Sequence, residues 1–286
     1  MKGIVLAGGT GSRLWPVTLG VSKQLLPVYD KPLIHYPIST LMLAGIRDIL
    51  VITTPLDKPN FQRMLGDGNQ FGINLSFCVQ EKPDGIAKAL VLGEDFINKD
   101  SVALILGDNI FHGTGLGAQL SKLKNISGAL VFAYKVKDPQ NYGVIELNKL
   151  GEPISIEEKP LVPKSRFVIP GLYFYDKNVV NFAKQIKPSA RGELEITDVN
   201  REYLKLNKLK VSILPRGTAW LDTGSFASLN DASSFVRILE DRQNQKISCL
   251  EEIAWRNKWI TNEQIMEAAE NYRNSPFADY LRGLLN

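Results

Sequence analysis

The chain has 286 residues, of which 44% are hydrophobic and 22% charged, and its net charge is +4. This composition is ordinary for a globular protein and excludes a collagen-like or disordered chain. Two cysteines are too few for a disulfide framework, and no apolar run approaches the roughly 18 residues of a membrane span. The mild charge and the absence of a signal-peptide pattern lead us to expect a cytoplasmic protein whose partners include neither a membrane nor a nucleic acid polymer.

The first half of the chain alternates short apolar runs with amphipathic stretches. Residues 3–7 predict a buried strand, and residues 33–45 predict a helix. Apolar runs at 49–53, 75–79 and 102–106 predict three more buried strands. Continuous apolar strands separated by helices are typical of βαβ units, in which helices cover both faces of a parallel sheet.

The second half of the chain differs in its pattern. Segments separated by Pro, Gly or Asn follow one another closely and predict a mixed or antiparallel extension of the sheet: 128–136, 142–147, 153–159 and 167–175. From Ser225 onward the pattern is helical, and no linker marks a domain boundary. We therefore predict one α/β domain over 1–286, with a core at 1–224 that carries a small β insertion and a helical C-terminal subdomain at 225–286.

A glycine-rich loop, AGGTGSRL at 7–14, follows the first predicted strand. Glycines let a backbone approach a polyphosphate closely, and this position is where parallel sheets bind ligands. The dinucleotide fingerprint needs a glycine where Leu14 stands, and the P-loop needs one where Arg13 stands, so neither motif fits. Arg13 and Lys23 are suited to clamp a triphosphate and its departing pyrophosphate. The alternative is a tight turn beside two solvated cations.

Two aspartates follow apolar runs far apart in the sequence. Asp108 comes directly after the strand predicted at 102–106, and Asp222 precedes the helix predicted from Ser225. Carboxylates together with substrate phosphates are the usual ligands of Mg²⁺. Each aspartate alone fits a helix cap or a turn equally well, so both interpretations stay open.

Further polar motifs end predicted strands. In the segment 80–85, QEKPDG, a glutamine amide and the loop backbone suit the edge of a base, and a Pro-Asp-Gly turn is the alternative. Glu158 and Lys159 suit a sugar hydroxyl and a phosphate, and Arg191 suits a phosphate; on pattern alone they fit a solvated strand end and a capping loop. His35 on a helix and His112 in a loop have no partner at metal-ligand spacing, so we expect both to be structural.

With these residues in place, the chain strongly resembles one family, the glucose-1-phosphate thymidylyltransferases among the sugar nucleotidyltransferases. The matching blocks follow in family order at 2–16, 22–46, 80–89, 106–111, 141–146, 154–160, 171–176, 191–200 and 219–224. The glycine loop with its arginine is shared by many sugar nucleotidyltransferases. The blocks SKQLLPVYDKP and RGELEITDVN are much more specific.

The resemblance implies a Rossmann-like mixed, mostly parallel sheet flanked by helices. It also implies the transfer of the thymidylyl group of dTTP to α-D-glucose 1-phosphate, which gives dTDP-glucose and pyrophosphate by Mg²⁺-assisted in-line displacement. A uridylyltransferase, a thymidylyltransferase for another sugar 1-phosphate and a non-catalytic nucleotide-sugar sensor are the alternatives.

Residue by residue, the resemblance places catalysis on Arg13, Lys23 and Lys159, and Mg²⁺ on Asp108 and Asp222. It places the nucleotide on Gly8, Gly11, Ser12, Arg13, Gln24, Gln80, Asp84 and Gly85. It places the sugar phosphate on Tyr142, Gly143, Glu158, Lys159, Tyr173 and Arg191. The family is further similar in being homotetrameric and inhibited by dTDP-rhamnose, which implies an effector site at Glu252, Ile253 and Arg256. The chain departs from the family pattern at Lys88, His112 and Pro170.

Overall fold

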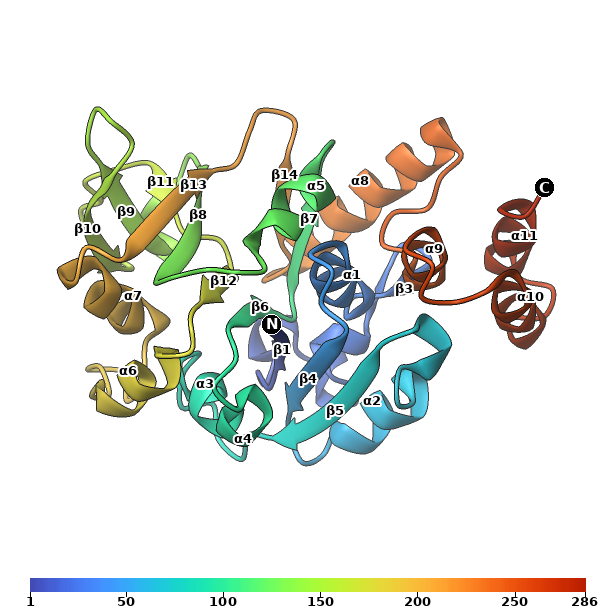
Figure 1. The fold of residues 1–286 in the computed structure, drawn as a ribbon, viewed down its shortest axis with the longest axis horizontal. Coiled ribbons are helices and arrows are strands. Elements are labelled where there is room, and N and C mark those ends of the chain that lie inside the picture. Colours follow the sequence, from blue (N-terminus) through green and yellow to red (C-terminus); the bar gives the residue numbers. More distant parts are fainter.

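A ten-stranded sheet runs through the centre of the computed structural model, which describes residues 1–286 (Figure 1). Its parallel half consists of β1 (Lys2–Ala7), β4 (Asp48–Thr53), β5 (Asn74–Val79) and β6 (Val102–Leu106). Its mixed half consists of β8 (Ala129–Lys135), β9 (Gly143–Leu147), β10 (Pro153–Glu158), β11 (Phe167–Val168), β12 (Leu172–Tyr175) and β13 (Leu209–Ile213). The strand order is β10-β9-β11-β8-β12-β6-β1-β4-β5, with β13 beside β8. The predicted Rossmann-like mixed sheet is thereby confirmed.

The strands of the parallel half are mostly apolar because helices cover both faces of the sheet. In β1, Val5 belongs to one apolar cluster and Ile4 to the other, and β4 divides in the same way. On one face lie α1 (His35–Leu43), α2 (Lys58–Leu65) and α5 (Leu116–Leu120). On the other lie α3 (Lys88–Leu92), α4 (Glu94–Ile97), α6 (Val179–Gln185) and α7 (Ile196–Lys205).

The mixed half corrects one predicted strand. The run expected at 167–175 is split into β11, which pairs with β8 and β9, and β12, which pairs with β6 and β8. Pro170 lies at the break and has no N–H for a strand ladder, and its carbonyl accepts the N–H of Leu172 at 2.8 Å. The chain therefore changes partner strands at this proline.

Two short sheets complete the carboxyl side of the central strands. The hairpin of β2 (Pro27–Val28) and β3 (Lys31–Pro32) follows the glycine loop. Strand β14 (Ala219–Asp222) pairs antiparallel with β7 (Asn109–His112). His112 therefore lies in a strand and not in the expected loop, and burial lowers its pKa.

The C-terminal quarter is helical, as predicted. Helix α8 (Phe226–Gln243) begins at a capping box in which Ser225 Oγ accepts the N–H of Ser228 at 3.1 Å. Helices α9 (Leu250–Arg256), α10 (Asn262–Asn271) and α11 (Pro276–Gly283) lie to the right in Figure 1. Their buried side chains share one apolar cluster with α1, and the division of the chain at 224/225 stays a prediction. None of the helices combines the length and the apolar character that crossing a membrane would require.

Candidate active site

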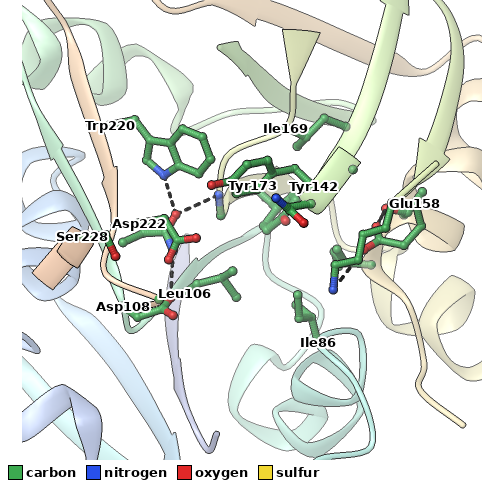
Figure 2. Close-up of a pocket in the computed structure, with 18 of the residues that line it drawn as sticks. Ile86, Leu106, Asp108, Tyr142, Glu158, Ile169, Tyr173, Trp220, Asp222 and Ser228 are labelled. Atoms are coloured by element: carbon green, nitrogen blue, oxygen red, sulfur yellow. Dashed lines mark hydrogen bonds and ion pairs between the residues drawn. The ribbon is translucent and has the colours of Figure 1, made fainter. Parts of the chain in front are cut away.

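A cavity of about 780 Å³ opens at the carboxyl ends of the central strands (Figure 2). The structure brings together in its lining these residues predicted from the sequence: Arg13, Asp108, Tyr142, Gly143, Glu158, Lys159, Tyr173 and Asp222. The other predicted residues of the site lie outside the lining: Gly8, Gly11, Ser12, Lys23, Gln24, Gln80, Asp84, Gly85 and Arg191. The cavity thus joins the predicted metal and sugar-phosphate residues to one cation of the glycine loop.

The glycine loop is fixed against the segment that carries Asp222. Thr18 Oγ1 donates to the carbonyl of Gly11 at 2.7 Å, which holds the loop in its turn. A Cβ placed on Gly224 would lie 3.1 Å from both Arg13 Nη1 and Asp222 Oδ1. The guanidinium and the carboxylate therefore both approach Gly224, where an added side chain would be in tight contact with both groups.

Asp108 and Asp222 are neighbours although 114 positions separate them. Asp222 ends β14 opposite Asn109, and the carbonyl of Asp108 accepts both the N–H of Thr223 at 3.3 Å and its hydroxyl at 2.9 Å. Figure 2 shows the two carboxylates side by side. The pairing of β7 with β14 is thus what assembles the acidic pair.

The two carboxylates differ in their electrostatics. Burial alone would raise the pKa of Asp108, but the ion pair with Lys23 and a hydrogen bond from Asn109 hold it below its ordinary value. Burial and the nearby charge of Asp108 raise the pKa of Asp222. Two close carboxylates that repel each other in a cavity are a hard oxygen donor pair, and this donor set fits a divalent cation that substrate phosphates help to hold.

Lys23 has a partner of its own in this site. Its side chain is buried, and its Nζ lies 2.7 Å from Asp108 Oδ2. The sequence led us to expect a cation free for phosphates, and the structure instead places it on the carboxylate of the acidic pair. Gln24 is also buried, and its Oε1 accepts a hydrogen bond from Ser22 at 2.8 Å.

Asn109 and Trp220 belong to the site although sequence reasoning did not select them. Asn109 Nδ2 donates to Asp108 Oδ1 at 2.8 Å. Its Oδ1 accepts from the indole of Trp220 at 2.6 Å and from the N–H of Gly171 at 3.2 Å. Asn109 therefore orients the Asp108 carboxylate, and its position directly after that aspartate was the one signal in the sequence.

The far wall of the cavity presents polar groups from β9, β10, β12 and α7. Lys159 has a positive φ of 44°, and its N–H donates to the carbonyl of Tyr142 at 3.0 Å. Glu158 Oε2 accepts a short hydrogen bond from the hydroxyl of Thr197. Burial, with the charges of Glu158 and Asp108, raises the pKa of Tyr173, which keeps its hydroxyl protonated and able to donate. The side chains of this wall suit a polyhydroxylated ligand.

Thr197 and Asn200 of α7 also line the cavity, and neither was selected as a site residue from the sequence. The alternative interpretation of the Arg191 segment was a capping loop, but neither Glu195 nor Thr197 caps α7 with its side chain. Thr197 bonds Glu158, and Glu195 accepts from Ser189 and Arg191 at 2.7 and 2.8 Å. These side chains tie the helix start to the cavity wall instead.

Arg191 lies at the edge of this wall and outside the cavity lining. Its Nη2 is 2.8 Å from Glu195 Oε1 and 3.6 Å from Glu158 Oε1. The guanidinium is therefore surrounded by carboxylates. An incoming phosphate would compete with them for it.

The loop after β5 holds the predicted base-binding residues. Gln80 is buried, and a Cβ placed on Gly8 would lie 3.1 Å from its Oε1, so the glutamine crosses to the glycine loop. The carbonyl of Asp84 accepts the N–H of Leu194 at 2.8 Å, and Ala87 donates to the carbonyl of Leu194 at 3.0 Å. This double contact fixes the loop, whose next residue, Ile86, lines the cavity.

The predicted effector residues lie on α9. Glu252 accepts from Arg256 Nε at 2.7 Å and from the hydroxyl of Tyr280 at 2.6 Å. Arg256 and Tyr280 line a second cavity of about 750 Å³, whereas Glu252 and Ile253 do not. The structure therefore places part of this predicted group at a cavity separate from the first.

Comparisons with known proteins identify the family of this chain. The model of the family described as nucleotidyl transferase matches residues 2–238. A glucose-1-phosphate thymidylyltransferase of Mycobacterium tuberculosis is 56% identical over 285 residues, which covers 100% of this chain and 99% of the relative. One of Neisseria meningitidis is 57% identical over 286 residues with the same coverage.

Solved structures share the fold of this chain. A Bacillus anthracis structure assigned to the glucose-1-phosphate thymidylyltransferases and solved with sucrose is 42% identical, with a TM-score of 0.76 over 83% of this chain and 95% of that one. A UDP-glucose pyrophosphorylase with UDP-glucose, 24% identical, shares the fold with a TM-score of 0.75 over 83% of this chain and 98% of that one. The chain belongs to the nucleotidyl transferase family, among the glucose-1-phosphate thymidylyltransferases.

Proposed function

We propose that this protein transfers the thymidylyl group of dTTP to α-D-glucose 1-phosphate, with Mg²⁺ as its metal ion. One observation carries the proposal. In a chain 56% identical over its whole length to a glucose-1-phosphate thymidylyltransferase, a single cavity joins Arg13 and two adjacent carboxylates to a wall of sugar-type donors and acceptors. A phosphate oxygen of glucose 1-phosphate attacks the α-phosphorus of dTTP, and the bond to the β-phosphate oxygen breaks as pyrophosphate leaves.

The residues of the cavity promote this reaction by positioning the two substrates and by stabilising the charge on their phosphates. Arg13 holds the leaving phosphates, since its guanidinium projects from the loop at the end of β1. Lys159 orients the attacking sugar phosphate from the opposite wall. Glu158, Gly143 and Tyr173 line the sugar there. The ring of Tyr142 packs against that of Trp220 with centroids 5.2 Å apart, and its carbonyl accepts the N–H of Lys159. A general base is unnecessary because the attacking phosphate is already ionised at neutral pH.

Asp108 and Asp222 would hold the Mg²⁺ ion. When bound, this ion neutralises charge on the phosphates as they react. Lys23 would then contact both Asp108 and the substrate, because phosphates that bind beside Asp108 bring further anionic oxygens close to the Lys23 ammonium. Its burial against Asp108 keeps it in place before the substrate arrives.

Three further properties are proposals that rest on the family resemblance. They are a homotetrameric assembly, a cytoplasmic location and inhibition by dTDP-rhamnose at Glu252, Ile253 and Arg256. Multi-angle light scattering tests the first. Loss of turnover on adding dTDP-rhamnose, abolished by Arg256→Ala, tests the last.

The central experiment measures pyrophosphate release from glucose 1-phosphate with dTTP, UTP, CTP, ATP and GTP in parallel. We expect the fastest release with dTTP and none with EDTA. Faster release with UTP would identify a uridylyltransferase. Release only with another sugar 1-phosphate would reassign the acceptor, and tight nucleotide binding without release would identify a sensor.

A further inference from the structure

The side chain of Gln80 is held in one orientation by Asp84. Gln80 Nε2 donates to Asp84 Oδ1 at 2.7 Å and lies 3.5 Å from the carbonyl oxygen of Gly85. A carboxylate only accepts hydrogen bonds, so the side of the carboxamide that faces Asp84 must be its NH₂ group. The hydrogen bond to the Asp84 carboxylate thus fixes which side of the Gln80 amide is NH₂ and which is oxygen.

The opposite side of the same amide has no partner. Gln80 is 5% exposed, and its side-chain hydrogen bonds within the chain are both donated by Nε2, so its Oε1 accepts none. This oxygen lies against the glycine loop, because a Cβ placed on Gly8 would be 3.1 Å from it. A ligand in contact with this loop therefore meets an unpaired acceptor on a buried side chain, and leaving that acceptor unpaired in the complex would cost affinity.

Asp84 is itself held from two sides. Its carbonyl accepts the N–H of Leu194 at 2.8 Å, which fixes its backbone. The ammonium of Lys88, one turn further along the chain, lies 3.9 Å from Asp84 Oδ2. The carboxylate therefore has a cation at one oxygen and Gln80 at the other.

We infer that Asp84 is a positioning residue that makes the site select a base with a protonated ring nitrogen. Thymine and uracil carry N3–H, which donates to an acceptor such as Gln80 Oε1. Cytosine carries a lone pair at N3, which would face the lone pairs of that oxygen. Without Asp84 the carboxamide is free to turn over and present NH₂ to cytosine. The inference deepens the proposed function and rests on Gln80 contacting the base of the nucleotide.

The test compares dTTP with dCTP in wild type, Asp84→Asn and Asp84→Ala. Binding is measured by isothermal titration, and turnover by pyrophosphate release at saturating glucose 1-phosphate. In Asp84→Asn the amide of the new side chain is able to face Gln80 with its NH₂, which lets Gln80 turn over. We expect the preference for dTTP over dCTP to fall about tenfold to a hundredfold in both variants, the cost of one mispaired buried group. The change should lie in KM and not in kcat.

Asp95→Asn is the matched control. Asp95 is an exposed residue of α4 without a hydrogen-bond partner, and the variant makes the same change of charge. We expect its nucleotide preference to equal that of wild type. An unchanged KM for glucose 1-phosphate in the Asp84 variants shows that they are folded.

Two results would overturn the inference. The first is a wild-type chain that binds dCTP as tightly as dTTP. The second is an equal loss of dTTP and dCTP binding in both Asp84 variants, which would mean that Asp84 only supports its loop. A wild-type chain that prefers dTTP in binding but releases no pyrophosphate would overturn the proposed function alone, and the binding ratios of the variants would still decide the role of Asp84.

Discussion

Replacing Gly85 with alanine tests whether the loop after β5 is locked to the segment before α7. Gly85 has a φ of 110°, and a Cβ there would overlap the backbone nitrogen and carbonyl oxygen of Leu194, with the carbonyl carbon at 2.8 Å. A side chain in this conformation costs about 1–3 kcal/mol. Relieving the overlap separates Leu194 from Asp84 and Ala87, and each broken hydrogen bond costs about 1 kcal/mol.

The expected loss for Gly85→Ala is therefore about 3–5 kcal/mol in the free energy of unfolding. Urea denaturation measures it, and KM for dTTP should rise in the same variant because the loop carries Gln80. Gly151→Ala is the control, since Gly151 has a φ of 82° but no heavy atom within 4 Å of its Cβ position. We expect it to lose only about 1–2 kcal/mol. Equal losses in the two variants would refute the proposed lock.

The remaining predictions concern charge. Asp222→Asn should lower turnover at least about 100-fold with little loss of stability, because burial and repulsion from Asp108 outweigh the attraction of its carboxylate to Lys23 and Arg13. Asp108→Asn should lower turnover and also cost about 3–5 kcal/mol in unfolding free energy, because Lys23 stays buried without its partner; equal stability of these two variants would contradict this. Arg13→Ala should lower kcat about 10²–10³-fold in pyrophosphate release, whereas an effect on KM alone would mean that Arg13 binds only the ground state. Hydrogen bonds to Asp176 outweigh burial and lower its pKa, so its stabilisation is present above pH 3.8 and is lost as pH falls below that value. Asp176→Asn should therefore be less stable than wild type at pH 7 in urea denaturation, and the gap should narrow as pH falls below 3.8; a gap that does not narrow at acidic pH would disprove the assignment.

The sequence by itself determined the parallel half of the sheet. The runs at 3–7, 49–53, 75–79 and 102–106 are mostly apolar because these strands lie between two layers of helices, and this pattern can be recognised in the sequence alone. The glycine loop and Asp108 were predictable for the same reason, since both directly follow such strands. The single strand predicted at 167–175 was wrong, because at Pro170 the chain leaves one pair of partner strands and joins another.

Only the tertiary structure decided which polar groups meet. Asp222 joins Asp108 through the pairing of β14 with β7, a contact between segments 114 residues apart that no local pattern encodes. The same holds for Lys23 on Asp108, for Thr197 on Glu158, and for the loop of Asp84 against Leu194. The spacing of apolar residues along a segment depends on which of its faces are buried, so this spacing can be read directly from the sequence. The partner of a polar side chain depends on how distant elements pack, and that packing exists only in the folded chain.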